Sequence, residues 1–93
     1  MTSIKKSGTN KFPYAHVKLT WEDIQASSEA WIDESDVLKN DIAVCEDIGY
    51  IFKKTKDKLW LFTSYSYDED KNLSVGGVTV FPVKVIKKIE RIK

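Results

Sequence analysis

The residues best suited to hold a ligand centre on one short run, Ser64-Tyr65-Ser66-Tyr67. Tyrosine rings can stack on a nucleotide base, and serine hydroxyls can donate hydrogen bonds to it. Lysine ammonium groups elsewhere in the chain can neutralise a phosphate. The candidate ligand-binding residues are Ser64, Tyr65, Ser66, Tyr67, Lys53, Lys54, Lys84 and Trp31. The same aromatic side chains would equally suit a protein interface or an ordinary hydrophobic core, so these alternatives stay open.

Residues that could carry catalysis are few. His16 occupies a polar position of an alternating segment, which is more typical of a surface residue than of a general base. Cys45 sits among Ile42, Val44 and Ile48, where an unreactive thiol is the default. Gly76-Gly77 is an isolated pair and indicates a turn instead of a phosphate-binding loop. We therefore expect a protein that is not an enzyme and that uses neither a metal nor a cofactor.

Charges alternate in blocks along the chain, although the formal net charge is only +1. Residues 21–52 hold nine carboxylates against Lys39, whereas lysines concentrate at both ends and in residues 53–58. We favour solvated faces as the explanation, and the alternative is a basic patch that binds an anion. A net charge near zero argues against binding along an extended nucleic acid.

Sequence features that report on location favour the cytoplasm. No run approaches the roughly 18 apolar residues of a membrane span. The N-terminal lysines lead into no apolar stretch, so no signal peptide is predicted. A single cysteine excludes an intrachain disulfide and suits a reducing compartment. We expect a cytoplasmic protein that makes no contact with a membrane.

The first half of the chain predicts a tail, a strand and a helical insertion. Residues 1–11 are expected to form a flexible basic tail, and residues 12–93 a single domain. Alternation from Tyr14 onward predicts a half-buried strand with Val17 and Leu19 on its apolar side. A capping-like start and helical spacing then predict one or two short helical turns at about 21–39.

The second half predicts four more strands. Residues 42–52 are expected to form one long bent strand, with a bulge marked by Glu46-Asp47 and Gly49. Residues 58–67 should form a central strand, because the first half of this segment is apolar on both faces. Another strand is predicted at 78–81. After Pro82, β-branched residues favour a strand over 83–92, with a helix as the competing interpretation.

This order predicts a mainly β protein with a short helical insertion. The expected architecture is a small, five-stranded, strongly bent barrel of the Sm-like or SH3-like kind. The candidate core residues are Trp21, Trp60, Phe62 and Phe81.

A scattered set of residues resembles short phage- and prophage-encoded proteins that we associate with Sm-like barrels. The matching pattern is Val17-x-Leu19-x-Trp21-x-Asp23-Ile24, Trp31, Gly49, Leu61-x-x-Ser64 and Val80-x-Pro82-x-x-x-Ile86-x-x-Ile89. The resemblance implies assembly into oligomers through strand edges, with RNA or nucleotides bound by the assembly. It also implies a location in the cytoplasm of the host cell.

These observations lead to three hypotheses of function. The first is a non-enzymatic, homo-oligomeric phage protein that sequesters a small anionic ligand, such as a nucleotide or a cyclic nucleotide immune signal. Tyr65 and Tyr67 would stack on the base, Ser64 and Ser66 would donate hydrogen bonds, and the lysines would neutralise phosphate. The second is an inhibitor or adaptor that binds a host protein through the acidic insertion. The third is an RNA-binding Sm-like protein, which the net charge disfavours.

Overall fold

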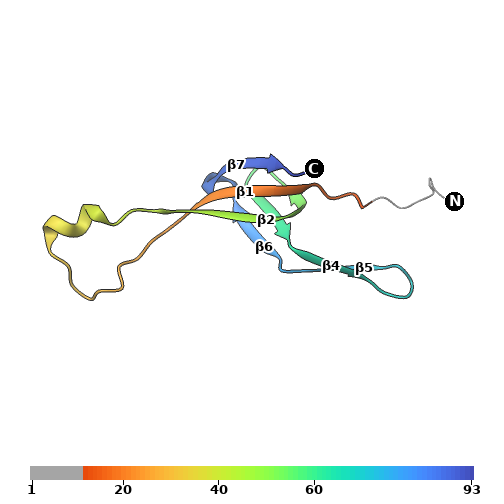
Figure 1. Ribbon diagram of the computed structural model, residues 1–93, viewed down its shortest axis with the longest axis horizontal. Coiled ribbons are helices and arrows are strands. Elements are labelled where there is room, and N and C mark those ends of the chain that lie inside the picture. The colour runs from red at the N-terminus through yellow and green to blue at the C-terminus, as the bar shows by residue number, and fades with distance from the viewer. Residues whose placement is uncertain (1–11) are drawn as a thin grey trace.

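The computed structural model describes residues 12–93, and the predicted basic tail lies outside the described residues. The chain is mainly β, as predicted. Its strands are β1 (His16–Asp23), β2 (Ala43–Lys54), β3 (Lys58–Phe62), β4 (Ser64–Tyr67), β5 (Leu73–Gly76), β6 (Thr79–Pro82) and β7 (Ile86–Arg91). Two 3₁₀ helices, η1 (Glu34–Lys39) and η2 (Val83–Val85), complete the fold. The five-stranded sheet has the order β6-β3-β2-β1-β7 with antiparallel neighbours, and β4 and β5 form a two-stranded hairpin (Figure 1).

A small hydrophobic core lies on one face of the five-stranded sheet. It is formed by Val17, Leu19, Leu59, Leu61 and Phe81, which are 0–2% exposed. The buried positions on β1 confirm the predicted alternation, because side chains two residues apart share a face of a strand. Among the four core candidates, Phe62 and Phe81 are buried, whereas Trp21 and Trp60 are only half-buried.

Strand β2 is one long strand, as predicted, but its bulge lies elsewhere. The ladder between β1 and β2 is unbroken from Ala43 to Tyr50, so the prediction of a bulge at residues 46–49 is wrong. The register shifts between Ile51 and Lys53 instead, where β2 pairs with β3. Gly49 has a different role, because a Cβ atom there would lie 2.6 Å from the backbone oxygen of Phe62.

The predicted helical insertion is shorter than residues 21–39. Strand β1 continues to Asp23, which pairs with Ala43, and helical residues are confined to η1. The side chain of Trp21 explains why the strand continues. Its ring packs edge-on against Phe81 at 5.2 Å, and its Nε1–H donates to Asp47 at 3.2 Å. These tertiary contacts outweigh the local helical spacing.

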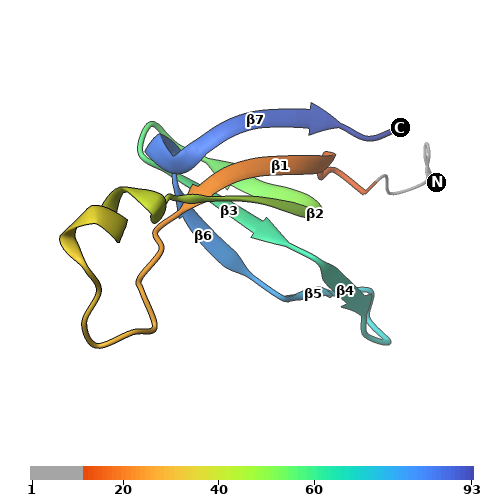
Figure 2. The same cartoon turned by 60° about the vertical axis from the view of Figure 1, so that its left-hand side comes forward.

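The predicted strand over residues 58–67 is divided at Thr63 into β3 and β4. Strand β3 lies between β2 and β6, which confirms its expected interior position. The Thr63 N–H donates to the Gly76 carbonyl at 3.1 Å, and Gly77 adopts a φ of 65°. The chain therefore bends at this point, and the β4–β5 hairpin projects from the sheet (Figure 2).

The strand preferred over residues 83–92 is confirmed for its larger part only, because residues 83–85 form a turn of 3₁₀ helix. Strand β7 covers Ile86–Arg91 and pairs with β1, and only the single turn η2 precedes it. Pro82 ends β6 at an edge of the sheet, where its missing N–H removes no ladder hydrogen bond.

Residues 24–42, which we call the arm, connect β1 to β2 and extend beyond the sheet at the end opposite the β4–β5 hairpin (Figure 1). The molecule measures 67 × 24 × 23 Å, with a radius of gyration of 19.1 Å. A compact chain of about 100 residues has a radius near 13 Å. No residue of η1 is buried. Within residues 12–93, no helix is long and apolar enough to cross a membrane.

Candidate functional site

An aromatic cluster lies where the start of β1, the second half of β2, the end of β3 and the start of β4 come together. Antiparallel pairing brings these rings together, because His16 lies opposite Tyr50 and Tyr50 lies opposite Phe62. His16 stacks on Tyr50 at 4.7 Å, and Phe12 stacks on Tyr65 at 4.5 Å. The cluster consists of Phe12, Tyr14, His16, Tyr50, Phe52, Phe62, Tyr65 and Tyr67. Each ring of the cluster contacts at least one other, although Phe52, Tyr65 and Tyr67 stay 44–54% exposed.

The two tyrosines proposed to stack on a base lie on one face of strand β4. Tyr65 opposes Val75 and Tyr67 opposes Leu73 in the hairpin. Phe12 already covers one face of Tyr65, whereas Tyr67 meets Tyr65 only edge-on at 6.1 Å. Tyr67 therefore offers the freer ring for a ligand.

The serines lie on the other face of the hairpin, because successive residues of a strand point to opposite sides. Ser64 opposes Gly76 and Ser66 opposes Ser74. A shallow hollow of about 350 Å³ is lined by Ser64, Tyr65, Ser66, Ser74, Val75 and Gly76. The structure thus brings the serine hydroxyls together but separates them from the exposed ring of Tyr67.

The three lysines proposed to bind phosphate lie at the other end of β3. Lys53 pairs with Trp60 and Lys54 with Leu59. At about 3.3 Å per residue along a strand, Tyr65 lies up to roughly 16 Å beyond Trp60. Lys84 lies in η2, whose first N–H donates to Asp57 in the β2–β3 turn at 2.8 Å. The lysines therefore lie around the β2–β3 turn and η2, whereas the tyrosines and serines lie in the β4–β5 hairpin.

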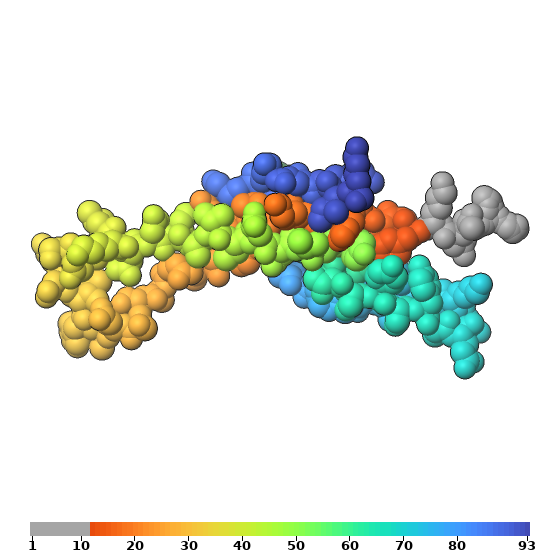
Figure 3. Space-filling model, viewed as in Figure 1, coloured from red at the N-terminus to blue at the C-terminus, as the bar shows by residue number. Residues whose placement is uncertain are grey.

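Trp31 lies in the arm and is 92% exposed. Two further apolar side chains of the arm, Ile24 at 86% and Leu38 at 94%, are equally uncovered. In the space-filling view the arm stands clear of the body (Figure 3). A hollow of about 460 Å³ in the arm is lined by Glu29, Trp31, Ile32, Asp33 and Asp36.

Sequence reasoning missed Ile24 and Leu38 as candidate binding residues. The sequence did contain a signal for them: both are large apolar residues inside the acidic segment, and neither belongs to an alternating strand pattern. The arm thus combines exposed apolar side chains with five carboxylates, Glu29, Asp33, Glu34, Asp36 and Asp41. That combination can recognise an apolar surface bordered by positive charge.

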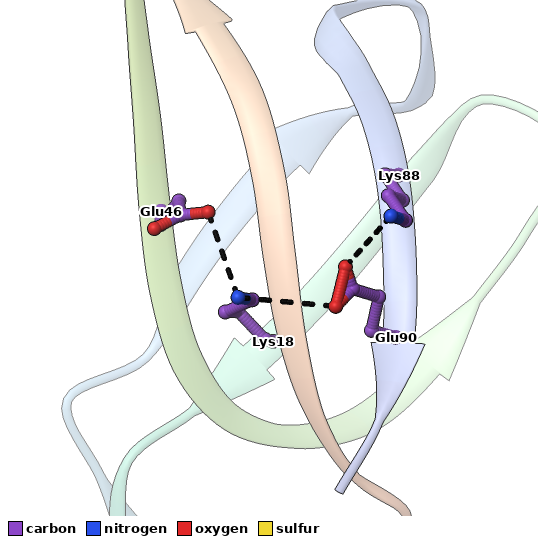
Figure 4. A network of polar contacts seen from close by, with 4 residues as sticks. All are labelled: Lys18, Glu46, Lys88 and Glu90. Atoms are coloured by element: carbon purple, nitrogen blue, oxygen red, sulfur yellow. Dashed lines mark ion pairs between the residues drawn. The ribbon is translucent and has the colours of Figure 1, made fainter.

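A network of ion pairs spans the solvent face of β1, opposite to the core residues Val17 and Leu19. Lys18 lies between Glu46 of β2 and Glu90 of β7, at 3.7 and 3.8 Å from their carboxylates, and Lys88 contacts Glu90 at 3.0 Å (Figure 4). The hydrogen bond from Lys88, together with the charges of Lys18 and Lys88, holds the pKa of Glu90 below its ordinary value of 4.5. The network joins three strands across their solvent face and leaves little free charge there.

In the loop at the tip of the hairpin, the carboxylate of Asp68 finds its hydrogen-bond donors within the loop itself. Asp68 accepts hydrogen bonds from the backbone N–H groups of Asn72 and Asp70, at 2.8 and 2.9 Å. These bonds, the Asn72 backbone bond foremost, hold the pKa of Asp68 below its ordinary value of 3.8. The carboxylate therefore orders the turn. Among the described residues no group of three or more His, Cys, Asp or Glu side chains could hold a metal ion.

No family model, curated protein or solved structure matches the chain. The resemblance to phage-encoded Sm-like proteins therefore stays a prediction. The eight residues proposed from sequence lie in three separate places, the hairpin, the end of β2 with η2, and the arm. Of these three places, the arm exposes the largest apolar side chains.

Proposed function

We propose that this chain is a protein-binding module that docks onto its partner through the arm. The observation that carries the proposal is the exposure of Trp31 and Leu38, at 92% and 94%. Large apolar side chains held away from a protein's own core mark an interaction surface, because covering them removes apolar area from water. Tryptophan is also among the residues that contribute most to binding energy at interfaces.

The charges of the arm define the chemistry of the partner. Glu29 and Asp33 line the hollow beside Trp31, so a lysine or arginine placed there would meet two carboxylates and the face of an indole. A cation over a tryptophan ring contributes about 0.5–1 kcal/mol at an exposed site. The partner surface that fits best is an apolar pocket with basic side chains at its border.

The five-stranded body of the protein anchors both ends of the arm. We propose that this body is a small barrel of the SH3-like kind. Two features support the proposal: β1 pairs with both β2 and β7, and the single turn η2 precedes the last strand. Because β1 and β2 form an unbroken ladder up to Asp23 and Ala43, both ends of the arm leave from paired strands.

Sequestration of a small anionic ligand such as a nucleotide is the second candidate function. The hollow lined by the hydroxyls of Ser64, Ser66 and Ser74 favours it, because these groups can donate hydrogen bonds to phosphate or sugar oxygens. A nucleotide bound at saturation would raise the melting temperature by mass action. A panel of nucleotides that leaves the melting temperature unchanged would remove this candidate.

A photoreactive amino acid at position 31 of the full chain tests the primary proposal. In cells that produce the protein, we expect position 31 to form a covalent adduct with another polypeptide. Glu69, an exposed residue at the tip of the hairpin, provides the matched control position. The absence of an adduct at position 31, or equal adducts at positions 31 and 69, would contradict the proposal.

A further inference from the structure

An apolar pocket of about 180 Å³ opens on the body of the protein. Its lining residues come from β2, β3, β5 and the segment before β6: Phe52, Trp60, Leu61, Phe62, Val75 and Val78. Phe52 and Val78 are each about half exposed, so the pocket is open to an incoming group. A cavity of roughly 150 Å³ holds a benzene molecule. The pocket therefore has room for one apolar side chain, such as a leucine or the six-membered ring of a tryptophan.

Two lysines lie on the same face of the sheet as Trp60, one of the residues that line the pocket. Lys53 is the cross-strand partner of Trp60, and directly opposed side chains share a face about 5 Å apart. Lys58 precedes Trp60 by two residues on β3 and therefore points to the same face. Within residues 12–93 neither lysine forms an ion pair with a carboxylate. The surface is thus an apolar pocket bordered by unneutralised positive charge.

The arm of the same chain does not reach this pocket. The arm extends from one end of the sheet, whereas Val75 belongs to the hairpin that projects from the other end (Figure 1). The arms of two copies are also unsuited to pack against each other. Both are acidic, and like charges that face each other across an interface are unfavourable. Trp31 and Leu38 therefore require a pocket on another molecule.

We propose that the partner of the arm is a second copy of this chain, an inference that rests on the protein-binding function proposed above. Trp31 or Leu38 of one protomer enters the apolar pocket of the other. Lys53 and Lys58 of the second protomer then approach the carboxylates of Glu29 and Asp33. In one arrangement, the apolar side chains of the arm fill the pocket while its carboxylates meet the lysines. Such combined complementarity fixes how the two partners are positioned against each other.

Sedimentation velocity on the full-length protein, from micromolar to millimolar concentration, tests the inference. We expect wild type to self-associate. Trp31→Ala with Leu38→Ala removes the apolar anchors, and Val78→Asp introduces a charge into the pocket that repels the arm. Each change should weaken self-association at least about tenfold, the equivalent of 1.4 kcal/mol. All three positions are exposed, so the fold should be retained, which circular dichroism checks.

A charge reversal gives the sharper test. Glu29→Lys with Asp33→Lys places two positive charges beside Trp31 and brings the net charge of the arm from −4 to 0. Lys53→Glu with Lys58→Glu makes the pocket border acidic. Each double variant alone should be monomeric, because like charges then face each other. An equimolar mixture should associate, because both arm and pocket contacts are matched again between the two variants. Glu69→Lys with Asp70→Lys is the control, and it should leave self-association unchanged.

The outcomes separate this inference from the proposed function. A photoreactive residue at position 31 that links to the pocket of a second copy supports both. An adduct with a different protein only, from a chain that stays monomeric, overturns self-association and leaves the protein-binding function standing. A mixture of charge-reversed variants that remains monomeric also overturns self-association. No adduct at position 31 overturns both.

Discussion

Replacing Gly49 by alanine tests how closely β2 approaches the end of β3. The new Cβ atom would lie 2.6 Å from the Phe62 backbone oxygen and 3.0 Å from Leu61 Cγ. The Phe62 oxygen is a backbone atom at the end of β3 and cannot rotate away as a side chain can, so the two strands must separate. Overpacking of this kind costs about 1–3 kcal/mol. For a chain of this length, total stability is roughly 5–14 kcal/mol. The substitution therefore removes a substantial part of it.

Urea denaturation followed by circular dichroism measures this effect, and Gly76→Ala provides the matched control. A Cβ atom at Gly76 would lie 2.9 Å from Ser64 Oγ, a hydroxyl that can rotate away. Alanine also restricts the unfolded chain, which adds about 0.4–1 kcal/mol where the native conformation permits it. We therefore expect Gly76→Ala to be neutral or slightly stabilising.

A Gly49→Ala variant with wild-type stability would refute the close approach of β2 and β3. Loss of stability in both variants to the same extent would refute the argument in another way, because the cost would then follow from replacing glycine and not from the Phe62 oxygen. A difference of more than about 1 kcal/mol between the variants supports the described register.

Three further predictions concern charge, backbone strain and one hydrogen bond. The pKa of Glu90 is lowered in the folded protein, so this carboxylate stabilises the fold fully above pH 4.5, and the stabilisation disappears as the pH falls through the lower native pKa. In urea titrations at a series of acidic pH values, Glu90→Gln should therefore lose less stability on acidification than wild type does. Lys71 has a φ of 65°, so Lys71→Gly should raise the free energy of unfolding, whereas a decrease would contradict strain at this residue. Trp21→Phe removes the donor to Asp47 and should cost about 0.5–1.5 kcal/mol, with no further loss when Asp47→Asn is added.

Much of the strand content could be predicted from sequence because alternation records which side chains are buried. Val17 and Leu19 on β1 and the apolar run of β3 are examples. The extent of β1 could not be predicted in this way. Trp21 and Asp23 fit a helical start locally, but their partners Cys45 and Ala43 lie more than 19 residues further along the chain. A ladder formed at that distance is invisible to local spacing.

The candidate site was harder to predict, since proximity in the fold depends on how strands turn. Lys53 and Tyr65 are separated by one turn and one strand, and the turn places Lys53 beside Trp60 instead. The opposite orientation of Tyr65 and Ser66, in contrast, follows from the two-residue period of any strand. Sequence alone also did not reveal that Leu38 is uncovered, because exposure of an apolar residue depends on every other element failing to pack on it.

The attachment of the arm also bears on how the protein can change over evolutionary time. Because the ladder closes at Asp23 and Ala43, the 19 residues from 24 to 42 enter and leave the sheet at one point. By loop-closure entropy, replacing them with a four-residue turn would stabilise the fold by only about 1.4 kcal/mol. The proposed recognition surface and the hydrophobic core thus lie in separable parts of one small chain. The arm can therefore acquire new apolar or acidic residues, and with them new partners, without altering the core that holds it.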